Sequence, residues 1–153
     1  RDIYSSPMSQ GTRCHQLATY IVFDSPLVML CDAPTAYRKE PECTRFIAGL
    51  PVVADETRIL QGKMGEYIVT ARRVGEDWIV GGLTDWEART VDLDLSFLPE
   101  GMFRAEIFCD GINADKKGED YRHEYRDVKR EDRLKMQLAP GGGFAIRLKK
   151  NHN

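Results

Sequence analysis

The 153-residue sequence lacks an apolar run that approaches the roughly 20 residues of a membrane span. Its 22 basic and 24 acidic residues leave a net charge of -2, which provides no basic surface for nucleic acid. The four cysteines contain no CxxC pair, so the spacing of a metal site is absent, and buried free thiols are favoured over disulfides: Cys14, Cys31, Cys43 and Cys109. These absences argue against a membrane-spanning protein, a nucleic-acid-binding protein and a cysteine metal site.

The three consecutive glycines at 141–143 lack the surroundings of a phosphate-binding loop. Such a loop needs a Lys-Ser/Thr pair and then a helix whose N-terminus faces the phosphate. Here Phe144, Ile146 and Leu148 alternate with less apolar residues, which is the period of a strand. Residues 134–138 alternate in the same way before the glycines. We therefore interpret residues 140–143 as a connection between two half-buried strands.

Residues 1–51 are predicted to be helical with one buried strand. One apolar stripe recurs at the spacing of a helix face: Cys14, Leu17, Ala18, Ile21 and Val22. A second stripe of this kind follows: Cys43, Phe46, Ile47 and Leu50. Between them, the continuous apolar run 27–31 is typical of a parallel strand covered on both faces. Such a strand needs parallel neighbours, so we expect residues 1–51 to be the end of a larger α/β domain.

Residues 52–153 show strand periodicity instead. Candidate strands cover 52–60, 66–74, 77–83, 90–98, 103–109, 123–129, 134–139 and 144–149, with turn residues between them. Eight short strands of this kind predict an antiparallel β-sandwich or barrel, of which we favour the sandwich. Its predicted core consists of Val91, Leu93, Leu95, Phe103, Ile107, Leu134, Met136, Leu138, Phe144, Ile146 and Leu148.

Several long blocks of the sequence resemble one known family. They are "GTRCHQLATYIVFDSPLVMLCDAPTAY", "EPECTRFIAGLPVVADETRIL", "GKMGEYIVTARRVGEDWIVGGLTDWEAR", "DLSFLPEG", "AEIFCDGINAD" and "LAPGGGFAIRL". Together they resemble the C-terminal region of glycoside hydrolase family 97, which includes α-glucosidases and α-galactosidases. The resemblance covers nearly all of the chain from about residue 7 onward.

The resemblance implies that the chain belongs to a larger enzyme with an N-terminal β-super-sandwich, a catalytic (β/α)8 barrel and a C-terminal β-sandwich. Residues 1–51 would be the closing helix, last strand and last helix of the barrel, and residues 52–153 the C-terminal sandwich. The implied partners are the barrel and N-terminal domain of the same enzyme, with an oligosaccharide as its substrate. The resemblance also suggests a periplasmic or secreted bacterial enzyme.

No position in this chain matches the catalytic carboxylates or the calcium-binding glutamates of the family. We therefore expect no catalytic residue, no metal ligand and no cofactor within this chain. Calcium is implied for the full-length enzyme only. The chain alone is predicted to be inactive as a glycosidase.

Two residues are candidates for a functional contact. Asp32 ends the predicted buried strand, where barrel active sites are built, and it either lies at the active-site rim or caps the turn at Pro34. Trp86, in the turn "TDWEA", contacts either a sugar or a neighbouring domain. Two further features have plainer interpretations: His15 as a packed or surface histidine, and "DGINAD" as a polar turn rather than a calcium loop.

Three functions remain open at this point. The chain is a structural, non-catalytic part of the enzyme, or a carbohydrate-binding β-sandwich module, or an interaction domain without a sugar ligand. The apolar stripes of residues 1–51 favour the first function. In the full enzyme we expect these stripes and the run 27–30 to pack against barrel elements absent from this chain, with part of the second stripe against the sandwich. In the isolated chain we expect residues 1–50 to be poorly packed, or to be buried in an oligomer or against another chain of the same enzyme.

Overall fold

The computed structural model of the chain describes residues 13–22, 45–46, 54–63, 65–85, 87–111 and 121–151. Within these ranges the main elements are α1 (Arg13–Val22), β1 (Glu56–Lys63), β2 (Tyr67–Val74), β3 (Asp77–Thr84), β4 (Arg89–Asp94), β5 (Phe103–Asp110), β6 (Tyr121–Val128), β7 (Arg133–Leu138) and β8 (Gly143–Lys150). A short 3-10 helix, η3 (Leu95–Phe97), follows β4. No helix in the described part of the chain is long and apolar enough to cross a membrane.

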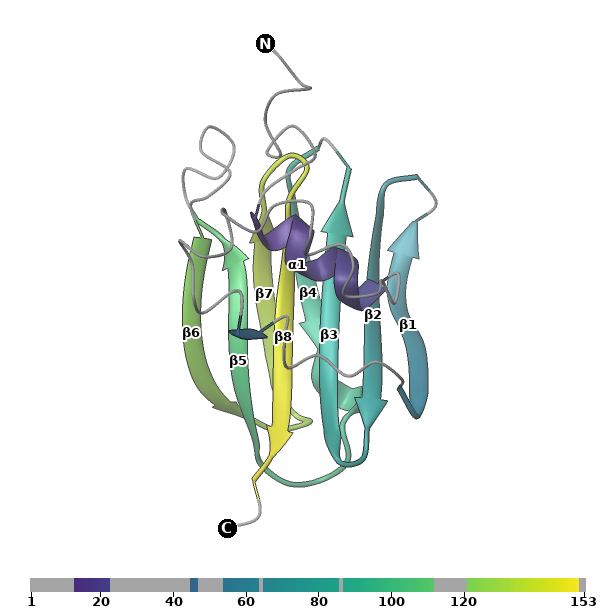
Figure 1. Ribbon diagram of the computed structural model, residues 1–153, viewed down its shortest axis with the longest axis vertical. Coiled ribbons are helices and arrows are strands. Elements are labelled where there is room, and N and C mark those ends of the chain that lie inside the picture. The colour runs from purple at the N-terminus through teal and green to yellow at the C-terminus, as the bar shows by residue number, and fades with distance from the viewer. Residues whose placement is uncertain are drawn as a thin grey trace.

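The strands form two antiparallel sheets, which confirms the predicted sandwich. Six strands pair in the order β1-β2-β3-β8-β5-β6, and β4 pairs with β7 in a second, two-stranded sheet. Figure 1 shows the small sheet behind the centre of the large one, with β1 and β6 at the two edges of the large sheet. The two edge strands therefore extend beyond the layer that covers the centre.

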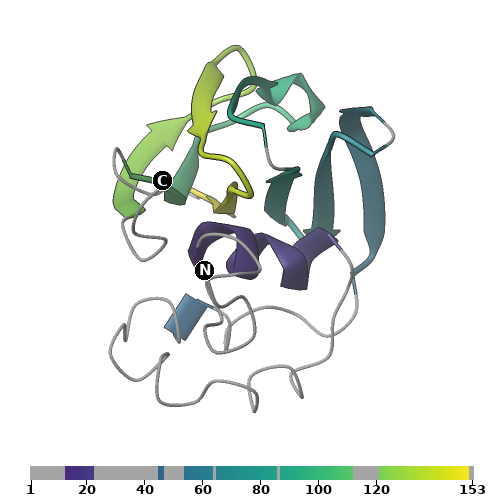
Figure 2. The ribbon, with the colours of Figure 1, turned by 90° about the horizontal axis from the view of Figure 1, so that it is seen from above.

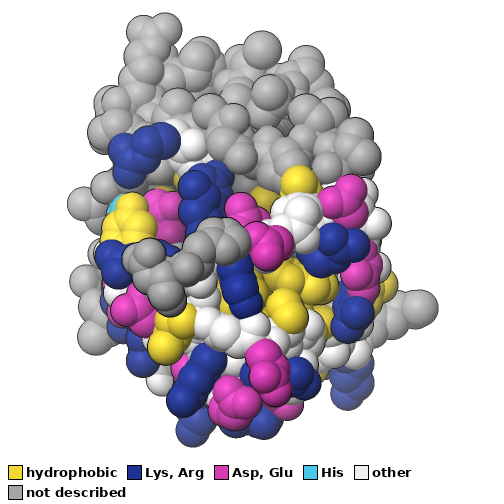
Figure 3. All heavy atoms as spheres, turned by 90° about the horizontal axis from the view of Figure 1, so that it is seen from below, with side chains coloured by type: hydrophobic (Ala, Val, Ile, Leu, Met, Phe, Trp, Pro, Cys, Tyr) yellow, Lys and Arg dark blue, Asp and Glu magenta, His cyan; other side chains and the backbone are white. Residues whose placement is uncertain are grey.

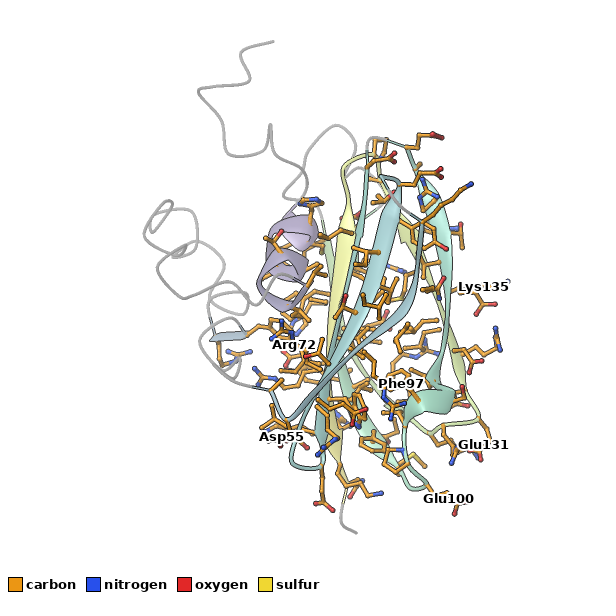
Figure 4. All side chains as sticks on the ribbon, turned by 90° about the vertical axis from the view of Figure 1, so that its right-hand side faces the viewer. Asp55, Arg72, Phe97, Glu100, Glu131 and Lys135 are labelled. Atoms are coloured by element: carbon orange, nitrogen blue, oxygen red, sulfur yellow. The ribbon has the colours of Figure 1, made fainter. Side chains whose placement is uncertain are left out.

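The main hydrophobic core lies between the two sheets. Every residue predicted for the core is buried in it, and Leu93 and Leu95 are fully buried. Asp92 and Asp94 on the same stretch are exposed, as the alternation predicted. Figure 4 shows Lys135 of β7 pointing away from this core, toward the outer side of the two-stranded sheet.

Two predicted strand boundaries differ from the structure by four residues, which is more than any of the others do. The strand predicted over 52–60 begins at Glu56, and residues 54 and 55 precede it. The strand predicted over 90–98 ends at Asp94, where the chain turns into η3. The carboxylate of Asp94 accepts a hydrogen bond from the backbone N–H of Ser96 at 3.0 Å, which caps this 3-10 turn and ends the strand.

Helix α1 covers the outer face of the larger sheet, on the side opposite the two-stranded sheet. Figure 1 shows it crossing in front of β8 and β3, and Figure 2 shows it lying against the sheet from above. It takes part in a second apolar cluster, which consists of Cys14, Leu17, Ile21, Phe46, Ile79, Phe108 and Ala145. The sheet therefore has an apolar layer on both faces.

This packing corrects one prediction and confirms part of another. The stripe of α1 was expected to face barrel elements absent from this chain, but Cys14, Leu17 and Ala18 are fully buried against the sandwich itself. The expectation that part of the second stripe packs on the sandwich is confirmed by Phe46, which is 1% exposed. The strand after the glycines is also not half-buried as predicted, because α1 lies on its outward residue Ala145.

Glycines on the sheet allow α1 to approach closely. A Cβ atom at Gly81 would lie 2.9 Å from the Cβ of Ile21 and 3.1 Å from the carbonyl oxygen of Ala18. A Cβ atom at Gly143 would lie 2.9 Å from the Cα of His15. A larger residue at Gly81 would push the helix away from the sheet. A larger residue at Gly143 would meet both the helix and the carbonyl oxygen of Gly82 on β3, which lies 2.7 Å away, so this last glycine serves strand pairing as well as helix packing.

The predicted barrel remnant over residues 1–51 stays a prediction. Of this part, the structure describes α1 and residues 45–46, while the run 27–31 and the residues around Cys43 lie outside the described ranges. The described pieces pack with the sandwich in one apolar cluster.

Candidate functional site

The two candidate site residues, Asp32 and Trp86, both lie outside the described residues. The turn that carries Trp86 is nevertheless defined on both sides. The hydroxyl of Thr84 donates to the carbonyl oxygen of Glu87 at 3.1 Å, and the backbone N–H of Glu87 donates to the carboxylate of Asp85 at 3.0 Å. These bonds hold Glu87 close to Thr84 and Asp85 at the end of β3, and the contact of Trp86 stays a prediction.

The glycine-rich loop is organised by the carboxylate of Asp110, which is only 5% exposed. Its Oδ2 accepts hydrogen bonds from the backbone N–H groups of Ala139 at 2.8 Å and Gly143 at 3.1 Å. Gly141 has a φ of 65°, which favours glycine, and its N–H donates to the carbonyl oxygen of Asp85 at 2.6 Å. The loop amides thus bind a side-chain carboxylate, a role for Asp110 that no pattern in the sequence predicts.

A cleft of about 690 Å³, with both polar and apolar side chains in its wall, lies beside this loop. Arg89, Arg122, Gln137 and Pro140 are among the residues that line it. The side chain of Arg89 is held in place, because its Nε donates to the hydroxyl of Thr84 at 2.8 Å. Guanidinium and amide groups donate hydrogen bonds to hydroxyl or anionic oxygens, so this cleft has the chemistry to bind a hydroxylated ligand.

A second cleft, of about 700 Å³, lies on the helix side of β1, β2 and β3 and is mainly apolar. His15, Ile59, Ile68 and Leu83 contribute to its wall. Ile59 is 69% exposed, whereas His15 is half-buried, and burial lowers the pKa of His15. This placement agrees with the interpretation of His15 as a packed residue.

A polar and aromatic cluster lies on the outer face of β5 and β6. The Oε2 of Glu106 is 2.8 Å from the Nε2 of His123, and it accepts a hydrogen bond from the hydroxyl of Tyr125 at 3.1 Å. The His123 ring stacks on Phe108 with 4.2 Å between ring centroids. No local pattern in the sequence indicates this cluster, because only the pairing of β5 with β6 brings Glu106 beside residues so far along the chain.

The described cysteines are buried free thiols, as predicted for Cys14 and Cys109. Burial raises the pKa of the Cys109 thiol, which keeps it in its unreactive protonated form. In the described ranges, no group of three or more His, Cys, Asp or Glu side chains could hold a metal ion. Most of the "DGINAD" segment falls in residues 112–120, outside those ranges.

Comparisons with known proteins agree with the sandwich and with the earlier resemblance. The chain is 58% identical over 146 residues to a retaining α-galactosidase from Bacteroides thetaiotaomicron, which covers 95% of this chain and 22% of the relative. In structure it is similar to a glycoside hydrolase family 97 enzyme in complex with acarbose from Pseudoalteromonas sp. strain K8, with a TM-score of 0.84 and 36% identity over 93% of this chain and 23% of that chain. It also resembles a β-arabinopyranosidase, with a TM-score of 0.64 and 26% identity over 90% of this chain and 21% of that chain.

The chain therefore spans only about a fifth of the length of these relatives, and it covers 22% of the length of the α-galactosidase. A family model described as "Glycosyl-hydrolase 97 C-terminal, oligomerisation" matches residues 53–149, which are the sandwich almost from end to end. That match and the shared sandwich place this chain in the glycoside hydrolase 97 C-terminal family.

Proposed function

We propose that this chain is the non-catalytic C-terminal domain of a retaining α-galactosidase. The observation that carries the proposal is its 58% identity to a retaining α-galactosidase, of which it covers only 22%. The described carboxylates support a structural role: Asp110 holds the glycine-rich loop and Asp94 caps η3. Glycoside hydrolysis needs a pair of carboxylates across the scissile bond, and we assign that pair to the remainder of the enzyme.

In this proposal the domain packs on the catalytic barrel and stabilises it. Two segments that precede the sandwich are already fixed to it, α1 and residues 45–46. The guanidinium of Arg147 donates to the carbonyl oxygen of Phe46 at 3.0 Å and lies 5.2 Å from the centre of its ring. These contacts attach both segments to the larger sheet, which supports a role of the sandwich in packing against the rest of the enzyme.

A second part of the role is assembly of several enzyme copies. The description of the matched family includes oligomerisation, which supports this assignment. The larger sheet also ends in two edge strands, β1 and β6, and neither of them pairs with a strand of the small sheet. Such edges are common places for chains to associate.

Any calcium that the enzyme uses is held by residues outside the described part of this chain. The described residues do not fit a calcium site, because they contain no cluster of three or more carboxylate, imidazole or thiol ligands. We assign the binding of the α-galactoside substrate to the remainder of the enzyme as well, because the substrate must lie between the catalytic carboxylates.

The test compares the 153-residue chain with the same enzyme extended to include a barrel upstream. We expect release of p-nitrophenol from p-nitrophenyl α-galactoside by the extended protein and none above the buffer rate by the chain alone. The α-glucoside serves as the specificity control. Release by the pure chain would contradict a non-catalytic domain, and exclusive release from the α-glucoside would contradict the assigned substrate.

Carbohydrate binding by the domain is the second candidate function. The cleft lined by Arg89, Arg122 and Gln137 favours it. This cleft adjoins the loop whose Gly141 N–H donates to the carbonyl oxygen of Asp85, the neighbour of Trp86 in the chain. Titration of the 153-residue chain with galactose-containing oligosaccharides would reveal heat of binding that Arg122→Ala and Trp86→Ala both remove. Equal, small heats for all three proteins would exclude this function.

A further inference from the structure

The two edge strands of the larger sheet differ in regularity. β1 pairs with β2 through a shifted register, with a bulge between Ile59 and Gln61. A bulge disturbs an edge and blunts it against further pairing. β6 instead pairs with β5 in unbroken register from Tyr121 to Val128. Figure 1 shows these two edges at opposite sides of the sheet. Of the two, β6 has the regular backbone that a further strand needs in order to pair with it.

β6 also carries alternating charges on one face. Glu124 and Arg126 stand opposite Ile107 and Ala105 in the register, so they lie on the side of the sheet that faces β4 and β7. Arg126 is exposed and Glu124 is half-exposed. Among the described residues, neither side chain forms an ion pair or a side-chain hydrogen bond. One negative and one positive group therefore remain available at this edge, two positions apart.

We propose that two copies of this domain pair through β6 as antiparallel strands, about a twofold axis beside Tyr125. The inference rests on the assembly role proposed above and names the surface that provides it. In this arrangement Tyr125 faces Tyr125 of the partner subunit, and Glu124 faces Arg126 of the partner subunit. The twofold axis repeats the ion pair on the other side. Side chains directly opposed on antiparallel strands lie about 4.5–5.5 Å apart at Cβ, within reach of an ion pair.

The charges select this register over its neighbours. A shift by a single residue would pair side chains from opposite faces of the sheet. An axis at Glu124 would set like charges opposite each other, Glu124 against itself and Arg122 against Arg126. An axis at His123 would pair Glu124 with Arg122 but would place Arg126 opposite a position before the start of β6. The axis beside Tyr125 is the one of these that pairs Glu124 with Arg126.

Tyr125 is held in position before any partner binds. The residue is 49% exposed, and its hydroxyl donates to the carboxylate of Glu106 at 3.1 Å. The guanidinium of Arg104 lies 5.2 Å from the ring centre and also forms an ion pair with Asp127 at 3.5 Å. A fixed aromatic ring loses little conformational entropy on association, so two such rings at the axis favour pairing.

Charge reversal tests the surface in the 153-residue chain by sedimentation velocity over a range of concentrations. Glu124→Arg sets arginine against Arg126 of the partner subunit, and Arg126→Glu sets two acidic groups opposite each other. Each change affects two cross-strand pairs in the dimer, so we expect the dissociation constant to rise about tenfold or more. An equimolar mixture of the two variants and the double exchange Glu124→Arg/Arg126→Glu should both restore the wild-type dissociation constant. Restoration also excludes misfolding as the cause.

Matched controls reverse charges away from this edge. Lys135→Glu on β7 and Glu100→Arg in the turn before β5 change the net charge by the same amounts, and both side chains are exposed. Figure 4 shows both away from the helix side of the sheet, Lys135 on the outer side of the small sheet and Glu100 at its lower end. We expect both controls to dimerise as the wild type does.

The outcomes separate this surface from the assembly role itself. A monomeric wild-type chain at every concentration would overturn both the surface and the proposed assembly role. A wild-type dimer that neither reversal weakens would overturn the β6 surface and leave the assembly role standing. Weakening by Glu124→Arg alone would overturn the axis beside Tyr125, since the register centred on His123 uses Glu124 but not Arg126.

Discussion

At the scale of single residues, the carboxylate of Asp110 decides the shape of the glycine-rich loop. It accepts backbone hydrogen bonds from Ala139 and Gly143 in a buried position. A charged acceptor forms hydrogen bonds roughly twice as strong as those of a neutral one. We expect Asp110→Asn to lower the free energy of unfolding by about 1–3 kcal/mol, measured by urea denaturation.

The matched control for this change is Asp92→Asn on β4. Asp92 is exposed and its bond is to the exposed side chain of Arg133, so we expect a loss of at most about 1 kcal/mol. Equal losses in the two variants would contradict the structural role of Asp110.

His15 should give the stability of the protein a pH dependence. Burial lowers its pKa, so between that value and the ordinary value of about 6.5 the unfolded chain binds more protons than the folded chain. The free energy of unfolding should therefore fall as the pH is lowered through this window. His15→Gln should reduce that fall, as urea denaturation at several pH values will show. At pH 8 the imidazole is neutral in both states, so the difference in stability there gives the intrinsic cost of the substitution. If the free energies of unfolding of the wild type and the variant fell in parallel below pH 8, His15 would not be the cause of the pH dependence.

At the scale of elements, the packing of α1 depends on glycine in β3. A methyl group at Gly81 would lie 2.9 Å from the Cβ of Ile21, a distance that real Cβ atoms essentially never show, and 3.1 Å from the carbonyl oxygen of Ala18, so the helix must move. We expect Gly81→Ala to lower the free energy of unfolding by about 1–3 kcal/mol. Gly62→Ala, on the same face of the sheet but on β1, meets Tyr67 at 3.2 Å and no part of the helix, and it should cost less. A larger loss for Gly62→Ala would rule out helix packing as the reason for Gly81.

The strands were predictable because each has one face toward a core and alternates accordingly. The predicted inward set of β4 and β7 is buried residue by residue. The strand beginning at Gly143 was predicted to be half-buried, and it is buried on both faces. The apolar stripe of α1 predicts that this helix packs on an apolar surface. The stripe does not identify that surface, which is the outer face of β3 and β8.

At the scale of the whole molecule, helix α1 and residues 45–46, which precede the sandwich in the chain, pack on its larger sheet. Removing residues 1–53 would uncover Ile79, Phe108 and Ala145 on the outer face of the sheet. Each large apolar side chain left exposed forgoes about 1.5–3 kcal/mol. We expect the shortened chain to unfold at lower urea concentration and to bind the dye ANS, which the 153-residue chain should not do. An unchanged urea midpoint would show that α1 contributes no stability.

Surface charge at this scale gives no sign of a nucleic-acid partner on the face described. Figure 3 shows basic and acidic side chains interspersed around a smaller apolar area at the lower end of the molecule. Mixed charge of this kind produces no large field of one sign, in agreement with the net charge of -2. Association at β6 therefore depends on local pairing of charges rather than on overall attraction.

The sequence by itself determined the strands, the inward residues of the main core and the absence of a phosphate-binding loop. It did so because the period of a strand and the residues after a glycine run are local properties of the chain. The tertiary structure alone decided what α1 covers, why Gly143 must be glycine, and that Asp110 and the Glu106–His123–Tyr125 cluster have partners. These contacts join residues distant in the sequence, and their geometry exists only once the strands have paired and the helix has packed on the sheet.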